Sequence, residues 1–202
     1  INLNTEEIWP EHIIELEKNG NTIVWEWHSW DHIIQDSDIN LPNFGNISEN
    51  PQRININYNK PIYTPNGSLS PNNGNGDWMH ANSIDYNDEL DQIIISLKRW
   101  DEIWIIDHST TTEEAQNSSG GIYGKGGDLL YRWGNPETYN QGTLNNKKLW
   151  GQHDVRWIEK KYPDEGKIMI FNNGSGGRDY SSIDIINPPI DENGNYEINE
   201  NG

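Results

Sequence analysis

Short apolar runs bounded by turn residues recur along the chain and predict β-strands. The first clear strand covers residues 22–27, where β-branched and aromatic side chains follow the turn dipeptide Gly20-Asn21. The preceding residues 4–18 place four aliphatic side chains among acidic ones, and this pattern fits either a short helix or a loop with a strand.

The most regular pattern lies within residues 78–134. Apolar runs at 81–86, 92–97, 102–107 and 128–133 predict four strands, and the tight link at 98–101 predicts an antiparallel hairpin. Hydroxyl residues at 109–112, followed by Glu113 and Glu114, predict the start of a helix. Four successive antiparallel strands are the unit of one β-propeller blade.

The same order of strands returns at 153–158, 167–171 and 182–186, while residues 22–27 resemble the fourth strand. We therefore predict an all-β chain that supplies about two and a half blades of a β-propeller. Residues 20–27 would end one blade, 78–134 would form a full blade and 150–202 most of the next. A β-sandwich or jelly roll is the alternative. The Asn-, Pro- and Gly-rich residues 36–77 predict a long surface insertion with almost nothing to bury.

Composition narrows the class of protein. The chain has 202 residues, a net charge of −18, 32% hydrophobic residues and a mean hydropathy of −0.92. Its 10 Trp and 9 Tyr favour a folded, aromatic-rich core over disorder. The negative charge argues against nucleic acid and anionic membranes as partners. The absence of Cys excludes disulfides and thiolate metal sites, and no apolar run is long enough for a membrane span.

Histidines are the main candidates for chemistry. His80 and His153 precede or begin equivalent strands, which in a propeller face the central channel, and imidazoles there can act as acid, nucleophile or donor to an anion. A structural, hydrogen-bonded role is the alternative for each. His28 and His32 are four residues apart, but no helical glutamate base accompanies them, so we expect no zinc site and no other metal.

The glycine-rich loops give weaker signals. Arg178 lies in such a loop, where its guanidinium could bind an oxyanion or simply pair with Asp179. Residues 36–47 fail the calcium-loop pattern, because Leu41 replaces the required glycine and Ile47 the bidentate acid. Residues 120–127 lack the spacing of a phosphate-binding loop.

Six stretches together resemble the bacterial arylsulfotransferases, the aryl-sulfate sulfotransferase propeller family. They span most of residues 20–186 in the family's order and comprise Val24-Trp25-Glu26-Trp27-His28, Asp77-Trp78-Met79-His80-Ala81-Asn82-Ser83, Glu102-Ile103-Trp104-Ile105-Ile106-Asp107-His108-Ser109-Thr110-Thr111, Gly126-Gly127-Asp128-Leu129-Leu130-Tyr131-Arg132-Trp133-Gly134-Asn135-Pro136, Gly151-Gln152-His153-Asp154 and Phe171-Asn172-Asn173-Gly174.

The resemblance implies a six-bladed propeller that transfers a sulfuryl group from a phenolic sulfate ester to a phenol. The implied route is ping-pong through a sulfohistidine, with no PAPS and no other cofactor. By motif, His80, His153 and Arg178 would be catalytic, and the expected substrate-binding residues are Asn82, His28, His32 and His108. The implied partners are an aryl sulfate donor and a phenolic acceptor, with a homodimer also considered. The resemblance places the protein in the periplasm or otherwise outside the cytoplasm.

Two departures qualify the resemblance. The family's nucleophilic His lies in a later blade, yet no His follows Arg178 here. A closed propeller also needs at least about four blades. We therefore expect the chain to be a fragment that is inactive alone. The alternative functions are a non-catalytic propeller module that binds glycans or small molecules, and a quinoprotein-like dehydrogenase, against which the failed calcium loop counts.

Overall fold

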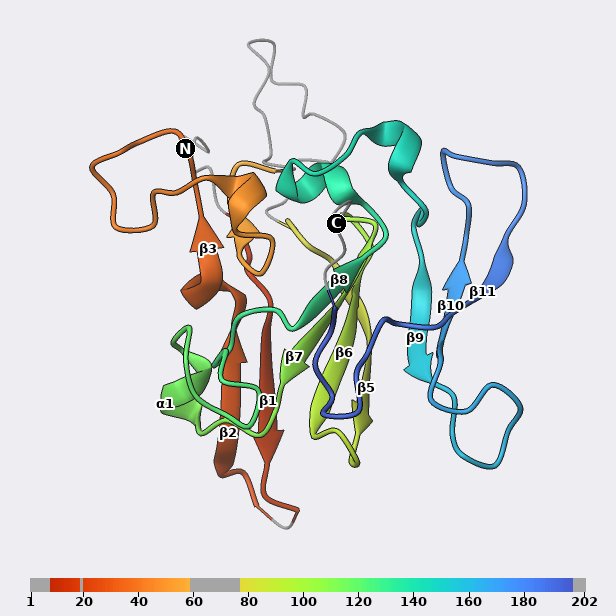
Figure 1. Cartoon of the computed structure of the whole chain (residues 1–202), viewed down its shortest axis with the longest axis horizontal. Coiled ribbons are helices and arrows are strands. Elements are labelled where there is room, and N and C mark those ends of the chain that lie inside the picture. The colour runs from red at the N-terminus through yellow and green to blue at the C-terminus, as the bar shows by residue number, and fades with distance from the viewer. Residues whose placement is uncertain (1–7, 19, 59–76, 198–202) are drawn as a thin grey trace, which may run out of the picture.

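A computed structural model describes residues 8–18, 20–58 and 77–197 (Figure 1). Over these residues the chain is mostly β-sheet, which confirms the all-β prediction. The described helices are short: α1 (Thr112–Ala115) and the 3₁₀ turns η1 (Ser29–His32), η2 (Ile47–Glu49), η3 (Pro136–Tyr139) and η4 (Leu144–Asn146). The predicted helix start is confirmed, because Thr111 and Glu114 form a reciprocal capping box at α1.

The central sheet has four antiparallel strands in the order β5 (Ala81–Asn87), β6 (Gln92–Leu97), β7 (Glu102–Asp107) and β8 (Tyr131–Trp133). Every residue of β6 and β7 is buried, including the polar residues at their ends, so burial does not alternate along these isoleucine-rich strands. Strand β8 is shorter than the predicted 128–133. The backbone N–H of Leu129 donates to Gln52 O, which is outside the sheet, and does not bond to β7.

Two smaller antiparallel sheets lie beside the central one. The first pairs β1 (His12–Leu16) with β2 (Ile23–His28), so the described part of the N-terminal segment, residues 8–18, contains a strand and not a helix. The second has the order β11 (Ser182–Ile186), β10 (Ile168–Asn172) and β9 (His153–Trp157). A short parallel pair joins β3 (Ile33–Ile34) to β4 (Ile54–Asn55).

The central sheet packs through both of its faces. One apolar cluster joins Trp25 and Trp27 of β2 to one face, where it includes Ile93, Ile95 and Trp104. The other face contributes Ile94, Ile103 and Ile105 to a second cluster with Val155 and Ile170 of the third sheet. Each indole removes about 200 Å² from water, worth roughly 5 kcal/mol at 25 cal/mol per Å². The aromatic residues thus compensate for the low hydrophobic fraction.

The first strands of the three sheets run in the same direction, as the arrows of β1, β5 and β9 show in Figure 1. Between β5 and β9, Ser83 Oγ accepts a hydrogen bond from Val155 N and Asp85 Oδ2 accepts one from Trp157 N. On the β1 side, Trp9 forms a parallel bridge with Asp77. The strand starts therefore gather at one end of the molecule.

Part of the predicted surface insertion is packed. Ile47 and Ile54 are almost fully buried, and β4 lies within residues 36–58. The expectation that this stretch buries almost nothing is wrong for residues 36–58, because two isoleucines suffice to fix a short loop. Residues 59–76 of the insertion lie outside the described residues.

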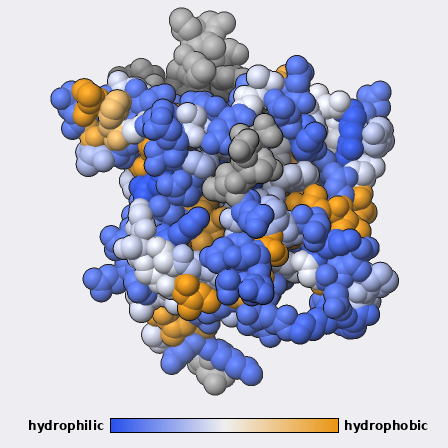
Figure 2. Space-filling model, in the orientation of Figure 1, coloured by the Kyte–Doolittle hydropathy of each residue, from blue (hydrophilic) through white to orange (hydrophobic). Residues whose placement is uncertain are grey.

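The surface is largely hydrophilic, but apolar atoms gather over β10 and β11 (Figure 2). Phe171 and Ile183 are register partners there, and both are exposed, as is Ile185. These side chains form an apolar face on the side of the third sheet that points away from the core. Among the described residues, no helix has the length and apolar character needed to cross a membrane.

Candidate functional site

His80 lies immediately before β5 in a left-handed conformation with φ of 58°. Its Nδ1 lies 2.6 Å from Oδ2 of Asp77, and that carboxylate also binds Arg99 at 3.1 Å. A carboxylate at Nδ1 favours the tautomer with the proton on that nitrogen. Nε2 has no hydrogen-bond partner among the described residues, so the ring is oriented while one nitrogen remains available.

His153 begins β9 and is held in a similar manner. Its Nδ1 lies 3.0 Å from Gly151 O and 2.9 Å from Asn173 Nδ2. Asn173 also donates to Gly151 O, which ties the loop after β10 to the start of β9. As with His80, the described residues leave Nε2 of His153 without a partner. Nε2 of each ring can therefore accept a hydrogen bond from a ligand when it is unprotonated, and it can donate one when the ring is an imidazolium.

Asn82 connects the two histidine positions. Its Nδ2 donates to Gln152 O at 2.8 Å, and it sits at the irregularity in the pairing of β5 with β6. Its Oδ1 is buried without a hydrogen-bond partner among the described residues. A buried, unsatisfied carbonyl costs about 1–3 kcal/mol unless a ligand or water reaches it. The structure therefore brings His80, Asn82 and His153 to adjacent strand starts.

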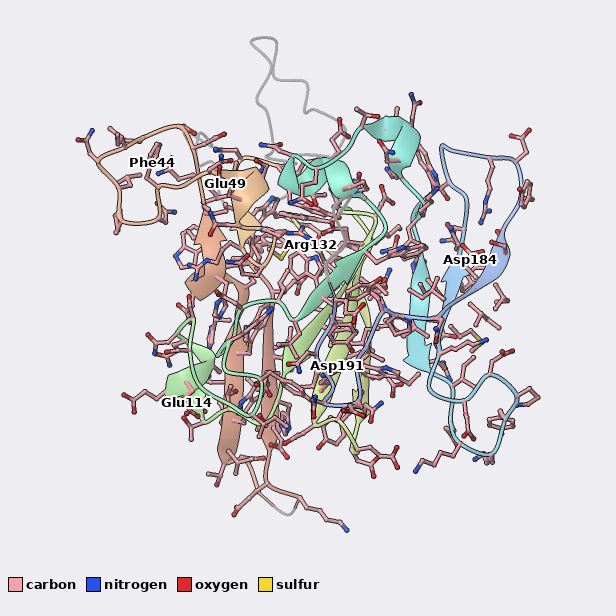
Figure 3. The ribbon with its side chains drawn as sticks, in the orientation of Figure 1. Phe44, Glu49, Glu114, Arg132, Asp184 and Asp191 are labelled. Atoms are coloured by element: carbon pink, nitrogen blue, oxygen red, sulfur yellow. The ribbon has the colours of Figure 1, made fainter. Side chains whose placement is uncertain are left out.

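Arg178 lies in the loop between β10 and β11, and its backbone N–H bonds to Gly174 O. Its Nη2 donates to Ser182 Oγ, and the guanidinium lies over the Tyr180 ring at 4.7 Å. Its Nε is buried without a partner among the described residues. Nη2 of Arg178 lies 3.9 Å from Oδ2 of Asp184, which is labelled in Figure 3, and the described residues contain no ion pair between Arg178 and Asp179.

His28 lies at the same end of the molecule as His80. It is the register partner of His12, the first residue of β1, and the two rings are stacked. His12 was not among the predicted site residues, because the segment before residue 18 fitted either a helix or a strand. The available signal was its position directly before the apolar pair Ile13-Ile14.

His32 does not join this group. It is fully buried, its Nδ1 lies 2.8 Å from Asp128 Oδ1, and its Nε2 lies 2.8 Å from Ala115 O. Its ring also stacks on Trp27. An imidazole with both nitrogens engaged and no exposed surface cannot contact a substrate, so we assign His32 to the core and correct its predicted substrate-binding role.

His108 lies at the opposite end of the central sheet, because it follows β7 whereas His80 precedes the codirectional β5. The length of β5 separates the two ends by about 20 Å at the usual rise per residue. Both ring nitrogens bind carboxylates, those of Asp91 and Glu15. His108 is thus too far from His80 to contact the same small ligand, and its substrate-binding role stays a prediction. It borders a separate cleft of about 400 Å³ between β1 and β5.

No group of three or more His, Asp or Glu side chains in residues 8–18, 20–58 and 77–197 is arranged to hold a metal ion. The groups gathered at these strand starts are two oriented imidazoles and a carboxamide, with a guanidinium in the loop after β10. The imidazolium form of histidine and the guanidinium are hydrogen-bond donors suited to anionic oxygens.

Comparison with known proteins assigns the chain to one family. The model described as "Arylsulfotransferase (ASST)" matches residues 4–202, which is nearly the whole chain. No curated protein and no solved structure matches the chain.

Proposed function

Because the chain belongs to the arylsulfotransferase family, we propose that it forms the donor-binding part of an enzyme that moves a sulfuryl group from a phenolic sulfate ester to a phenol. The observation that carries the proposal is the matched geometry of His80 and His153. Each begins or precedes a parallel strand, is anchored through Nδ1 and has an Nε2 that no described residue occupies.

In the proposed reaction, negative charge develops on the sulfuryl oxygens and on the departing phenolate. In their imidazolium forms, His80 and His153 donate through Nε2–H to these oxygens, since oriented donors act most strongly where charge appears during the reaction. Arg178, in the loop after β10, adds a guanidinium donor, while Asn82 on β5 joins the two histidine positions through its bond to Gln152 O. We propose that the group passes through a sulfohistidine, formed when a histidine nitrogen attacks sulfur and the sulfur–phenolate bond breaks. No nucleotide sulfate is involved.

The same proposal includes a six-bladed propeller. Two observations support it: the central sheet packs through both faces, and the first strands of three sheets run parallel at one edge. The exposed Phe171 and Ile183 on β10 and β11 provide a further apolar face of the kind that a following blade covers. A second copy of the chain covering this face would instead give a homodimer.

Export to the periplasm is part of the proposal and is tested by cell fractionation.

The test uses the whole encoded protein with 4-nitrophenyl sulfate as donor and phenol as acceptor. We expect release of 4-nitrophenolate that depends on phenol, and a loss of at least about a hundredfold in His153→Ala and His80→Ala, typical of removing an acid–base group. His108→Ala is the matched control, since it removes an imidazole at the other end of the sheet. Normal turnover by His153→Ala would remove that residue from the mechanism.

The alternative of a non-catalytic binding module gives a different result. Mass spectrometry of the protein after exposure to donor should find a histidine-containing peptide heavier by one sulfuryl group. Ligand binding with no such adduct and no turnover would favour the binding module.

A further inference from the structure

A stacked histidine pair lies beside the proposed sulfuryl site and takes no part in it. The His12 and His28 rings have centroids 5.1 Å apart and planes within 12° of parallel. Nε2 of His28 lies 3.2 Å from Glu26 Oε2, which holds that ring in place. His12 is exposed, and none of the described residues forms a hydrogen bond with its ring. The pair therefore presents an aromatic surface to solvent.

Glu11 joins this pair to the start of β5. Its Oε1 accepts a hydrogen bond from Ala81 N at 2.8 Å, directly after His80. Its backbone carbonyl accepts from both the N–H and the hydroxyl of the buried Ser29, which follows His28. One residue thus connects both strands of the histidine pair to His80. Packed sheets lie about 10 Å apart, a span that a substituted phenyl sulfate can bridge.

We propose that the His12–His28 stack binds the aromatic ring of the phenolic substrate. This inference rests on the proposed function, in which His80 and His153 hold the sulfuryl oxygens. The carboxylate of Glu26 borders the stack, 3.2 Å from Nε2 of His28, and repels an anionic group. It therefore favours the uncharged ring at the stack and leaves the sulfate to the donors of the neighbouring strand starts, which orients the ester.

The first experiment is a nuclear magnetic resonance titration of the chain, with the imidazole Cε1–Hε1 signals assigned by single His substitutions. Three probes are added separately: 4-nitrophenyl sulfate, phenol and sodium sulfate. We expect the His12 and His28 signals to move with the two aromatic probes and not with sodium sulfate. The His80 and His153 signals should move with the two sulfate-bearing probes.

Two variants test the role of the ring itself. His12→Phe keeps an aromatic face, so the dissociation constant for 4-nitrophenyl sulfate should stay within about twofold of the unsubstituted chain. His12→Ala should raise it roughly threefold to tenfold, the value of one aromatic stacking contact. Tyr162→Ala is the matched control: it removes an exposed aromatic ring from the loop at the other end of β9 and should change nothing.

The outcomes separate this inference from the proposed function. If 4-nitrophenyl sulfate shifts the signals of His80 and His153 but not those of His12 and His28, the stack does not bind the ring. The proposed sulfuryl site is then still supported. If sodium sulfate moves His12 as much as the aromatic probes do, the stack binds anions and the inference is overturned. If His80 and His153 respond to no sulfate-bearing probe, the proposed function itself fails.

Discussion

Glu102 and Arg132 form a deeply buried ion pair, and removing one partner should strongly destabilise the fold. Glu102 is completely buried and accepts hydrogen bonds from Arg132, Thr138 Oγ1 and Trp104 Nε1. Arg132 lies at the centre of the molecule (Figure 3), with its guanidinium 4.5 Å from the Tyr139 ring. Burial raises the pKa of the Glu102 carboxyl despite these donors, which shows how costly this charge is to desolvate.

The expected loss in the free energy of unfolding follows from that burial. Glu102→Ala leaves a buried guanidinium without its counter-ion, and such a loss costs about 3–5 kcal/mol. Arg132→Met should cost about the same, since it leaves the carboxylate unpaired. The double variant Glu102→Leu with Arg132→Met should cost at least about 2 kcal/mol less than the sum of the two single changes, because neither charge then remains.

Urea denaturation, monitored by tryptophan fluorescence, measures these differences in the free energy of unfolding. The comparison holds when all variants share the same m value, the slope of that free energy against urea concentration. Arg156→Ala is the matched control: it breaks an exposed pair with Asp154 and should cost less than about 1 kcal/mol. A cost below about 1 kcal/mol for Glu102→Ala, or strict additivity in the double variant, would refute the argument that the pair is coupled and fully desolvated.

Three further predictions concern single residues. Burial raises the pKa of Asp107, so ionising this carboxyl costs stability as the pH rises from the ordinary aspartate pKa through the folded-state pKa. Asp107→Asn carries no such cost, so its stability relative to the unsubstituted chain should rise over that pH range, measured by urea denaturation at each pH. Gly127→Ala places a Cβ 2.0 Å from Ala115 O and should lower stability by at least about 2 kcal/mol, whereas Gly124→Ala meets nothing within 4 Å and should cost about 1 kcal/mol for its positive φ; equal thermal shifts for both would contradict this. His32→Ala should lower the melting temperature and leave the affinity for 4-nitrophenyl sulfate unchanged. A loss of affinity without a lower melting temperature would instead show that His32 binds substrate.

The pattern of the chain predicted the strands best where local signals were strongest. The buried strands at 92–97 and 102–107 were predicted to the residue, because each is an isoleucine-rich run bounded by turn residues. The segment before residue 18 stayed ambiguous, since a five-residue exposed strand carries little periodic signal. Ile47 and Ile54 were lost in a polar background, and only packing shows that they are buried.

The site was predicted less completely, and the reason is topological. Six histidines near strand ends look alike in sequence, but the strand starts and ends lie on opposite sides of the sheet. His80 and His153 were correctly grouped because both stand at the start of a strand, whereas His108 follows one. His12 was overlooked because its strand was not recognised.

The sequence by itself determined the all-β class and the family, because apolar runs, turn residues and motif order are local properties of the chain. Tertiary structure alone decided what each imidazole does. His32 is enclosed by Asp128 and Ala115, which are 96 and 83 residues away, and His12 meets His28 only through the pairing of β1 with β2. The chemistry of an imidazole depends on the groups within hydrogen-bond or stacking distance, and those neighbours are set by the fold.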